Sequence, residues 1–230
     1  MKISIIIPVF NEVNYIGTVI DKVCEKKKEF DLEIIVSDDG STDGTIDLIK
    51  NNSKIDKFIT KKNEGKGSAI IHALNYVTGD LVLIQDADFE YSPDDYKLLI
   101  DPFTKDNADV VYGSRFQGSS KKRIIYYRNR VANFFLTHLS NLFTNLNFSD
   151  VECGFKVFKT QVLKKINLQE KSFGFEIETT MKISKLNLRI FEVGVSYLGR
   201  TKEEGKKIGF KDGLRAIYVI LKYKFFNKFL

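Results

Sequence analysis

The chain has 230 residues, of which 43% are hydrophobic and 29% charged, so it has enough apolar material for one sizeable core and too little length for several independent domains. Its 15 glycines and 3 prolines exclude collagen-like and proline-rich classes, and its 13% aromatic content argues against intrinsic disorder. The net charge of +6 favours an anionic partner: nucleic acid, phospholipid or a phosphorylated small molecule.

The cysteine count and the first residues indicate the compartment. Cys24 and Cys153 are the only cysteines, and Met1 is followed directly by a strand-like apolar run rather than by a signal peptide. We therefore expect a reduced, cytoplasmic protein without a disulfide. The longest uncharged run, 131–149, contains many polar side chains that a lipid-embedded helix would leave unpaired, so it does not predict a membrane span.

In the first half, short β-rich runs alternate with helical periods, which is typical of a parallel sheet covered by helices. In chain order, strands are predicted over 3–9, 32–36, 81–84 and 109–112, and helices over 16–23, 46–49, 70–77 and 96–103. Helix-end signals accompany three of these helices. Ser41, Thr42 or Asp43 is expected to cap the second helix, and Gly79 is expected to end the third in the left-handed conformation. Ser92–Asp95 is expected to open the fourth with an N-cap serine, a first-turn proline and a capping-box acid.

After Gly118 the composition changes. The basic cluster 121–123 leads through Arg128 and Arg130 into a long aromatic-rich helix that is expected to reach about Leu146. Later strands are predicted over 152–158 and 189–195, with a helix over 176–186 between them. No internal repeat is visible. Because the composition changes after Gly118, we place a soft boundary near 118, inside one domain of 1–230.

Four polar segments lie where the chain is expected to leave the sheet, and we call these segments exits. The exit with the most acids is 85–90, where Asp86, Asp88 and Glu90 come directly after a buried strand. Ligands of an open parallel sheet gather beyond the carboxyl ends of its strands, so these acids lie where a site is expected. Hard carboxylate oxygens suit magnesium or manganese, although two aspartates two residues apart reach one cation only if the chain bends there.

The other exits are 8–12, the acidic turn 38–44 and the segment 63–68. A carboxylate of the acidic turn could accept hydrogen bonds from a nucleobase or a ribose. In 63–68, glycines allow the backbone to approach a ligand closely, and Lys66 adds a positive charge at a helix start. The spacing of a P-loop is absent, which argues against ATPase or kinase chemistry.

These motifs together resemble those of family 2 glycosyltransferases with the GT-A fold, and more narrowly those of the dolichyl-phosphate mannose synthase-like, polyprenyl-phosphate glycosyltransferase branch. The resemblance rests on Pro8-Val9-Phe10-Asn11-Glu12, Asp38-Asp39-Gly40-Ser41-Thr42-Asp43-Gly44-Thr45, Asn63-x-Gly-Lys-Gly, Asp86-Ala87-Asp88, Gly113-Ser114-Arg115-Phe116 and Gly199-Arg200-Thr201 with Glu203-Glu204-Gly205-Lys206-Lys207. The motifs follow the family order and extend over about the whole chain.

The resemblance implies an α/β fold with a Rossmann-like, mostly parallel central sheet flanked by helices, and a C-terminal amphipathic helix. It divides the single domain into a nucleotide-sugar-binding half (1–118), an acceptor half (119–209) and an amphipathic tail (210–230). The implied donor-binding residues are Pro8, Phe10, Asn11, Glu12, Asp38, Asp39, Lys66, Gly67, Asp86, Ala87, Asp88, Lys206 and Lys207.

The resemblance also implies a catalytic group of Asp86, Asp88, Arg115 and Arg200, an acceptor-phosphate group of Arg115, Arg128 and Arg130, and Mg²⁺ or Mn²⁺ held by Asp86, Asp88 and Glu90. The implied substrates are a GDP- or UDP-linked sugar and a polyprenyl phosphate. An acceptor phosphate is already ionised near pH 7, because its second pKa is about 6, so direct displacement with inversion requires no general base.

Two other functions remain open from the residues. If the acceptor is a saccharide or protein hydroxyl, a base is needed, and Asp150 is the acid that we nominate. A non-catalytic basic module that binds nucleic acid is the remote alternative, although acids clustered at a ligand site repel a phosphate backbone. We expect no nucleic-acid partner, and an oligomer is possible.

The C-terminal segment, 212–230, mixes large apolar residues with lysines and an arginine. Its uncharged run, 216–221, is too short to span a bilayer. This composition is typical of a helix on an anionic membrane surface, and docking on a protein is the alternative. We therefore expect a protein peripherally associated with the inner face of the membrane.

Overall fold

The computed structural model describes residues 1–118, 122–124, 126–207 and 209–226. Its centre is one seven-stranded sheet with the strand order β3-β2-β1-β4-β6-β5-β7. The strands are β1 (Lys2–Val9), β2 (Asp31–Asp38), β3 (Lys57–Thr60), β4 (Leu81–Ile84), β5 (Val110–Ser114), β6 (Lys156–Lys159) and β7 (Ile190–Gly194). The helices are α1 (Ile16–Glu25), α2 (Thr45–Ile49), α3 (Lys66–Ala73), α4 (Tyr96–Lys105), α5 (Tyr127–Thr144), α6 (Thr160–Lys165), α7 (Phe175–Ile183) and α8 (Phe210–Leu221).

The sheet is mostly parallel. Strands β1 to β4 pair in parallel, β6 runs antiparallel between β4 and β5, and β7 pairs in parallel with β5. The sheet continues across residue 118, since β6 lies between two strands that precede this position. The predicted mostly parallel sheet with flanking helices is therefore confirmed.

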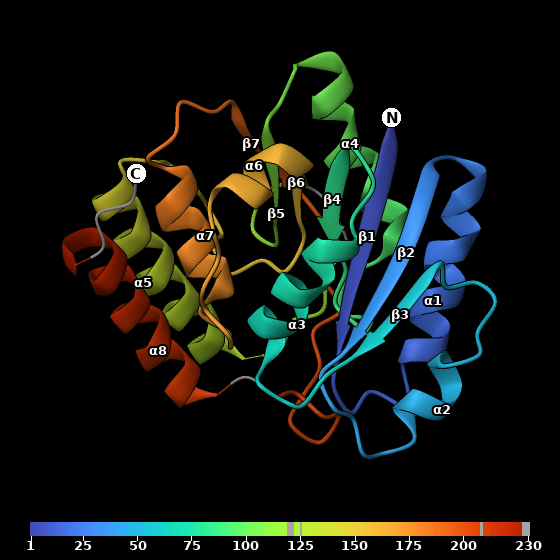
Figure 1. Cartoon of the computed structure of the whole chain (residues 1–230). Coiled ribbons are helices and arrows are strands. Elements are labelled where there is room, and N and C mark those ends of the chain that lie inside the picture. The colour runs from blue at the N-terminus through green and yellow to red at the C-terminus, as the bar shows by residue number, and fades with distance from the viewer. Residues whose placement is uncertain (119–121, 125, 208, 227–230) are drawn as a thin grey trace.

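Two apolar cores cover the two faces of the sheet. In β1, Ile3, Ile5 and Ile7 belong to one core, with side chains from α1 and α4, and Ile6 belongs to the other. This alternation is the two-residue period of a strand, and both faces are apolar because helices cover both. The second core draws on α3, α5, α6, α7 and α8, and α5 and α8 form the outermost layer on that side (Figure 1).

Several element boundaries differ from the prediction. Helix α5 ends at Thr144, and Asn145 follows in the left-handed conformation. The predicted strand over 152–158 forms only at Lys156–Lys159, and the predicted 176–186 helix is Phe175–Ile183. Sequence analysis missed β3 and α6, because β3 has only four residues and only one of them is buried.

The predicted helix-end signals are confirmed only in part. Gly44, at φ 92°, holds the N-cap position of α2, and the side chain of Asp43 just before it accepts from the Thr45 amide at 3.0 Å. Gly79 is not left-handed: it lies against β1, where an added Cβ would be 2.7 Å from the Ser4 nitrogen. Ser92 does accept from the Asp94 amide at 3.2 Å, but it opens a 3₁₀ turn, and Asp95 accepts from the Ser196 amide at 2.7 Å instead of closing a capping box. At Gly79 and at Asp95, contacts with residues far along the chain decide the local conformation.

The C-terminal helix α8 continues into a π-helical turn, Lys222–Phe226. The predicted tail residues 227–230 and Lys121 of the basic cluster lie outside the described residues. Within the described part of the chain, no helix combines the length and the apolar character that a bilayer crossing requires.

Candidate active site

Strand register brings the polar exits together. Val9 lies opposite Asp38 in the parallel pair β1–β2, and Ile6 lies opposite Ile84 in β1–β4. The Asp39 amide donates to the Val9 carbonyl at 2.8 Å, which continues the pairing beyond the strand. The exits of β1, β2 and β4 therefore meet at one edge of the sheet, as the sequence predicted.

The two aspartates after β2 have different roles. Asp39 accepts from Lys61 Nζ at 2.9 Å and from the Gly65 amide at 2.6 Å, so it holds the 63–65 loop in place. Asp38 Oδ2 accepts from the Gly40 and Ser41 amides at 2.9 and 3.0 Å. Asp38 Oδ1 is buried and has no partner, which leaves one acceptor for a ligand.

Lys66 joins two acids that are far apart in the sequence. Its Nζ lies 2.7 Å from Asp86 Oδ1 and 2.8 Å from Glu176 Oε1 of α7. Burial acts to lower the pKa of Lys66, but these two carboxylates raise it well above its ordinary value, so the side chain stays charged. Gly67 packs so closely on the Glu170 carbonyl that an added Cβ would overlap it. Sequence analysis missed Glu176, because no local motif marks it.

The exit of β4 bends sharply, as two acids aimed at one site require. Phe89 has a φ of 58°, and Asp88 Oδ1 accepts from the Glu90 amide at 3.1 Å. Burial, followed by the charges of Asp86 and Glu90, raises the pKa of Asp88 to about 7. Asp86, Asp88 and Glu90 are therefore close enough to repel one another.

Arg200 is the counter-charge of this acidic edge. Its guanidinium donates to Glu12 at 2.9 and 3.1 Å and to Asp88 at 3.0 Å, and its amide donates to Glu90 at 2.6 Å. The Arg200 side chain is only 9% exposed. The segment after β7 thus reaches back over the exits of β1 and β4.

The predicted lysines of this segment lie at the same edge. Lys207 Nζ contacts the Phe10 carbonyl and donates to Glu12 at 2.7 Å. Lys206 donates to the Tyr197 hydroxyl at 3.1 Å, and that hydroxyl donates to Glu90 at 2.9 Å. A cavity of about 230 Å³ lies beneath the segment, and it is lined by Asn11, Glu12, Val13, Asn14, Tyr15, Asp43, Arg200, Glu203, Glu204, Gly205 and Lys207.

Three of the predicted donor residues serve the framework. Pro8 is buried in β1 opposite Ser37, and Ala87 belongs to the apolar core. Asn11 adopts a φ of 50°, and its Oδ1 accepts from the Thr42 amide at 2.8 Å. Asn11 therefore ties the first exit to the second.

Arg115 forms a bidentate ion pair with Asp150. Its Nε and Nη2 donate to the two carboxylate oxygens at 2.7 Å each, and its guanidinium lies 5.3 Å from the Tyr197 ring centre. Asp150 is fully buried and also accepts from Asn133 at 2.9 Å. Burial acts to raise the pKa of Asp150, but the charge and hydrogen bonds of Arg115 outweigh it and hold that pKa below its ordinary value.

This geometry does not support Asp150 as a general base. Both carboxylate oxygens are occupied, and a lowered pKa opposes proton uptake near pH 7. Asp150 as the base for a hydroxyl acceptor therefore stays a prediction that this geometry does not favour.

The other two predicted acceptor arginines lie at the start of α5, and both are exposed. The Arg130 guanidinium lies 5.7 Å from the Phe116 ring centre, the same distance as that of Arg115. Arg128 lies 5.0 Å from the ring centre of Tyr126. Arg115 and Arg130 thus share one aromatic ring, and Arg128 lies nearby along the chain.

The aspartates after β4 have the chemistry of ligands for a divalent cation. Asp86 occupies room that exists only because residue 154 is glycine: a Cβ there would overlap Asp86 Oδ2. Carboxylate oxygens are the ligands that Mg²⁺ and Mn²⁺ prefer. Among the residues that the structure describes, however, no three His, Cys, Asp or Glu side chains are arranged to hold a metal ion. Asp86 and Asp88 are instead paired with Lys66 and Arg200. The role of Glu90 as a third ligand stays a prediction.

A mostly parallel sheet covered by helices, whose strand exits bring carboxylates, lysine and arginine to one edge, defines an α/β domain with its candidate site at the carboxyl ends of the strands. The chain belongs to glycosyl transferase family 2, whose family model matches residues 4–167. This result confirms the family that the motifs indicated.

Relatives agree with this assignment. The chain is 32% identical over 180 residues to the dolichyl-phosphate beta-glucosyltransferase ALG5A of Trichomonas vaginalis, covering 71% of this chain and 55% of that protein. It is 28% identical over 181 residues to the UDP-N-acetylglucosamine–dolichyl-phosphate N-acetylglucosaminyltransferase of Methanococcus voltae, covering 70% and 71%. Both names are consistent with the polyprenyl-phosphate branch.

Solved structures agree on the fold. Glucosyl-3-phosphoglycerate synthase from Mycobacterium tuberculosis, in complex with Mn²⁺, uridine diphosphate and phosphoglyceric acid, superposes with a TM-score of 0.76 at 20% identity, covering 99% of this chain and 80% of that one. A second complex of that enzyme, with Mn²⁺, uridine diphosphate and glucosyl-3-phosphoglycerate, has a TM-score of 0.72 at 21% identity, covering 97% and 80%. The GT-A fold is confirmed.

Proposed function

We propose that this glycosyltransferase moves a sugar from a nucleotide diphosphate sugar to a polyprenyl phosphate, with inversion at the anomeric carbon. The observation that carries the proposal is the meeting of Asp86 and Asp88 with Lys66 and Arg200 at one edge of the sheet. Acids suited to a divalent cation and bases suited to phosphate are the two groups that bind a cation–diphosphate pair. Family membership supports the same reaction class.

In this proposal Asp38 Oδ1 accepts a hydrogen bond from the nucleoside. This oxygen is buried, has no partner and lies at the end of β2, where the polar exits meet. Asp86 and Asp88 would hold Mg²⁺ or Mn²⁺, and the bound cation would neutralise charge on the departing diphosphate. Arg200, Lys206 and Lys207 exchange their contacts with Glu12, Glu90 and Tyr197 for the diphosphate oxygens. These cations are already at the edge, so only their side-chain partners have to change on binding.

The surroundings of Asp150 favour a phosphate acceptor over a hydroxyl acceptor. A hydroxyl acceptor needs a base, and Asp150 is fully paired, whereas a phosphate arrives ionised. Arg130 and Arg128 supply exposed positive charge beside Arg115, where such a phosphate would bind. The names of the two dolichyl-phosphate transferases among the relatives support this choice. With a lipid acceptor, we propose that the protein acts peripherally at a membrane surface, on its cytoplasmic face.

The proposal is tested by incubating the protein with labelled UDP- or GDP-sugars, manganese and polyprenyl phosphate. We expect butanol-extractable labelled lipid, and its loss when EDTA is added. A thermal-shift panel of UDP-, GDP- and dTDP-sugars with manganese identifies the donor, because a ligand that binds the folded form raises its apparent stability. Absence of labelled lipid with every donor, together with transfer to a saccharide or protein hydroxyl, would replace the proposed acceptor.

Gly154→Ala tests the space around Asp86. The added Cβ would overlap Asp86 Oδ2, so the carboxylate must move away from the predicted cation position. We expect the affinity for nucleotide sugar with manganese to fall by about tenfold, which corresponds to about 1.4 kcal/mol. Titration calorimetry measures this affinity. Gly17→Ala in α1 is the control, because nothing lies within 4 Å of its added Cβ; equal donor affinity of the two variants would show that Asp86 does not hold the cation.

A further inference from the structure

Helix α5 carries large apolar side chains on its outer face. Phe134 is 71% exposed and Leu142 is 67% exposed, and Tyr127, Val131 and Phe135 are also exposed. Their spacing of three, four and seven residues places them along one side of the helix. Exposed aromatic residues in such a continuous stripe are uncommon on a protein surface that faces only water.

The fully buried positions of the same helix are mostly polar, although Leu139 and Phe143 also pack partly against the core. Leu136 is buried there, but so are Asn133, Thr137 and Ser140. Asn133 donates to Asp150 at 2.9 Å, and Thr137 donates to Asn133 at 3.3 Å. A helix that faced water on its outer side would have the opposite distribution. The reversed polarity of α5 indicates that its outer side has an apolar environment.

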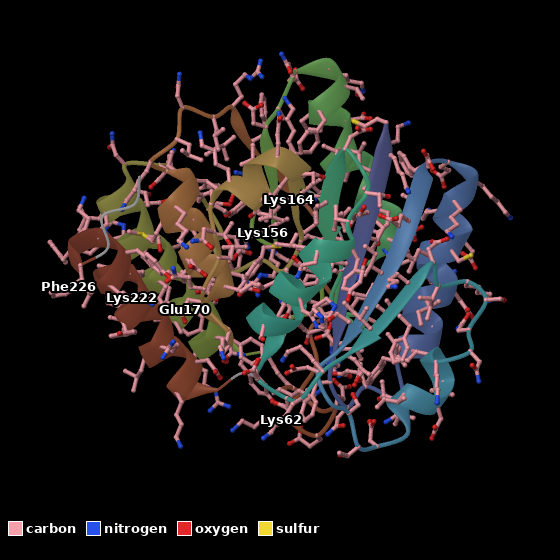
Figure 2. The ribbon with its side chains drawn as sticks, in the orientation of Figure 1. Lys62, Lys156, Lys164, Glu170, Lys222 and Phe226 are labelled. Carbon is pink, nitrogen blue, oxygen red and sulfur yellow. The ribbon has the colours of Figure 1, made fainter. Side chains whose placement is uncertain are left out.

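Helix α8 and its π-helical turn extend this apolar surface. Leu214, Tyr218, Leu221 and Phe225 repeat at intervals of three or four residues and are exposed. The opposite side of α8 packs into the core through residues that include Val219 and Ile220. Phe225 reaches α5, where its ring centre lies 5.7 Å from that of Phe143. Figure 2 labels Phe226 at the outer edge of this layer. We call these two outward sides the α5–α8 face.

The charges on these elements are mainly positive. Helix α5 contains Arg128 and Arg130 and no acid, and the segment 210–226 contains Lys211, Arg215, Lys222 and Lys224 against one acid, Asp212. Arg215 and Lys222 pair with buried Glu170, at 2.7 and 3.1 Å, which fixes α8 to the body of the protein (Figure 2). Asp212 accepts from the Gly209 amide at 2.8 Å, so it serves the helix start.

We propose that the α5–α8 face lies on the surface of an anionic lipid bilayer, with its aromatic residues among the lipid headgroups and its basic residues other than Arg215 and Lys222, which pair with Glu170, beside the lipid phosphates. Aromatic residues interleaved with basic ones match that environment in both polarity and charge. A second copy of the chain fits less well, because a two-fold contact through this face would bring like charges together.

The proposal deepens the proposed function and rests on it for the identity of the acceptor. Both helices begin at the end of the molecule where β1 and β2 terminate (Figure 1). The start of α5 carries Arg130, which shares the Phe116 ring with Arg115. A bilayer under this face would bring a lipid-linked phosphate to the same arginines that the proposed function assigns to the acceptor.

Flotation of the full chain with vesicles tests the α5–α8 face. We expect binding to phosphatidylcholine vesicles with about a third phosphatidylglycerol, and weaker binding to phosphatidylcholine alone. F134S/F135S removes two exposed rings, so its affinity for the anionic vesicles is expected to fall by about tenfold or more. The matched control is L48S/L98S, whose leucines are each 47% exposed on α2 and α4, and it is expected to bind like the parent. Thermal unfolding verifies that both variants are folded.

Three results would overturn the proposal: no flotation with either vesicle, equal flotation of F134S/F135S and the parent, or a dimer by light scattering that F134S/F135S dissociates. The last result would assign the face to a second copy. Transfer measured in detergent micelles separates this proposal from the proposed function, since F134S/F135S should retain transfer to solubilised acceptor. Vesicle binding without any transfer would refute the function alone, and transfer without vesicle binding would refute the face alone.

Discussion

Asp88→Asn is expected to reduce sugar transfer by about 10²- to 10³-fold, which is the loss typical of removing one preorganised electrostatic group from an active site. The substitution keeps the shape of the side chain and removes its charge. Asp88 lies at the exit of β4, 3.0 Å from Arg200, and burial with two neighbouring acids already makes its charge costly. Buried carboxylates that raise each other's pKa are concentrated at functional sites, where a bound ligand balances their charge. The initial rate of labelled lipid formation measures the effect.

Asp94→Asn is the matched control for that experiment. Asp94 pairs with Lys26 at 2.7 Å, but its side chain is 73% exposed on the surface. Surface pairs contribute about 0–1 kcal/mol, so transfer by this variant should be unchanged. If Asp88→Asn transferred sugar within threefold of the parent rate, Asp88 would have no part in holding the diphosphate.

Asp150→Asn is expected to lower the free energy of unfolding by about 3–5 kcal/mol, because it leaves the Arg115 guanidinium without its buried counter-charge. Asp150 is fully buried, and the Arg115 side chain is 17% exposed. Urea unfolding at pH 7, followed by circular dichroism, measures the difference. Asp101→Asn is the control, since its partner Lys105 is 67% exposed, and it should cost less than about 1 kcal/mol.

The same pair predicts a pH dependence of stability. The pKa of Asp150 is lower in the folded protein than in the unfolded chain, where aspartate has a pKa of about 3.9. Its contribution is therefore fully present above about pH 4 and is lost as the pH falls through the folded value. The stability difference between the parent and Asp150→Asn should be constant from pH 7 to pH 5 and should narrow below pH 4. A difference that stayed constant down to pH 3 would contradict the ion pair as its source.

The sequence determined the sheet and the place of the site. Apolar runs such as 3–9 and 81–84 are typical of strands buried on both faces, and the carboxyl ends of parallel strands meet at one edge. The alternation of such runs with helical periods favours parallel pairing, so the exits 8–12, 38–44 and 85–90 were expected to come together. This expectation held for β1, β2 and β4, which are parallel, whereas β6 is antiparallel.

The tertiary structure alone decided which charges are paired at that edge. Lys66 meets Glu176 across 110 positions, and Arg200 meets Glu12 across 188. The sequence presented Asp150 as a possible base, and only its burial against Arg115 showed that its oxygens are occupied. The predicted capping box failed for the same reason, since Asp95 accepts from the Ser196 amide instead of from its own helix. Residue type limits what a side chain can do, but its partners depend on packing between distant segments, which no local pattern records.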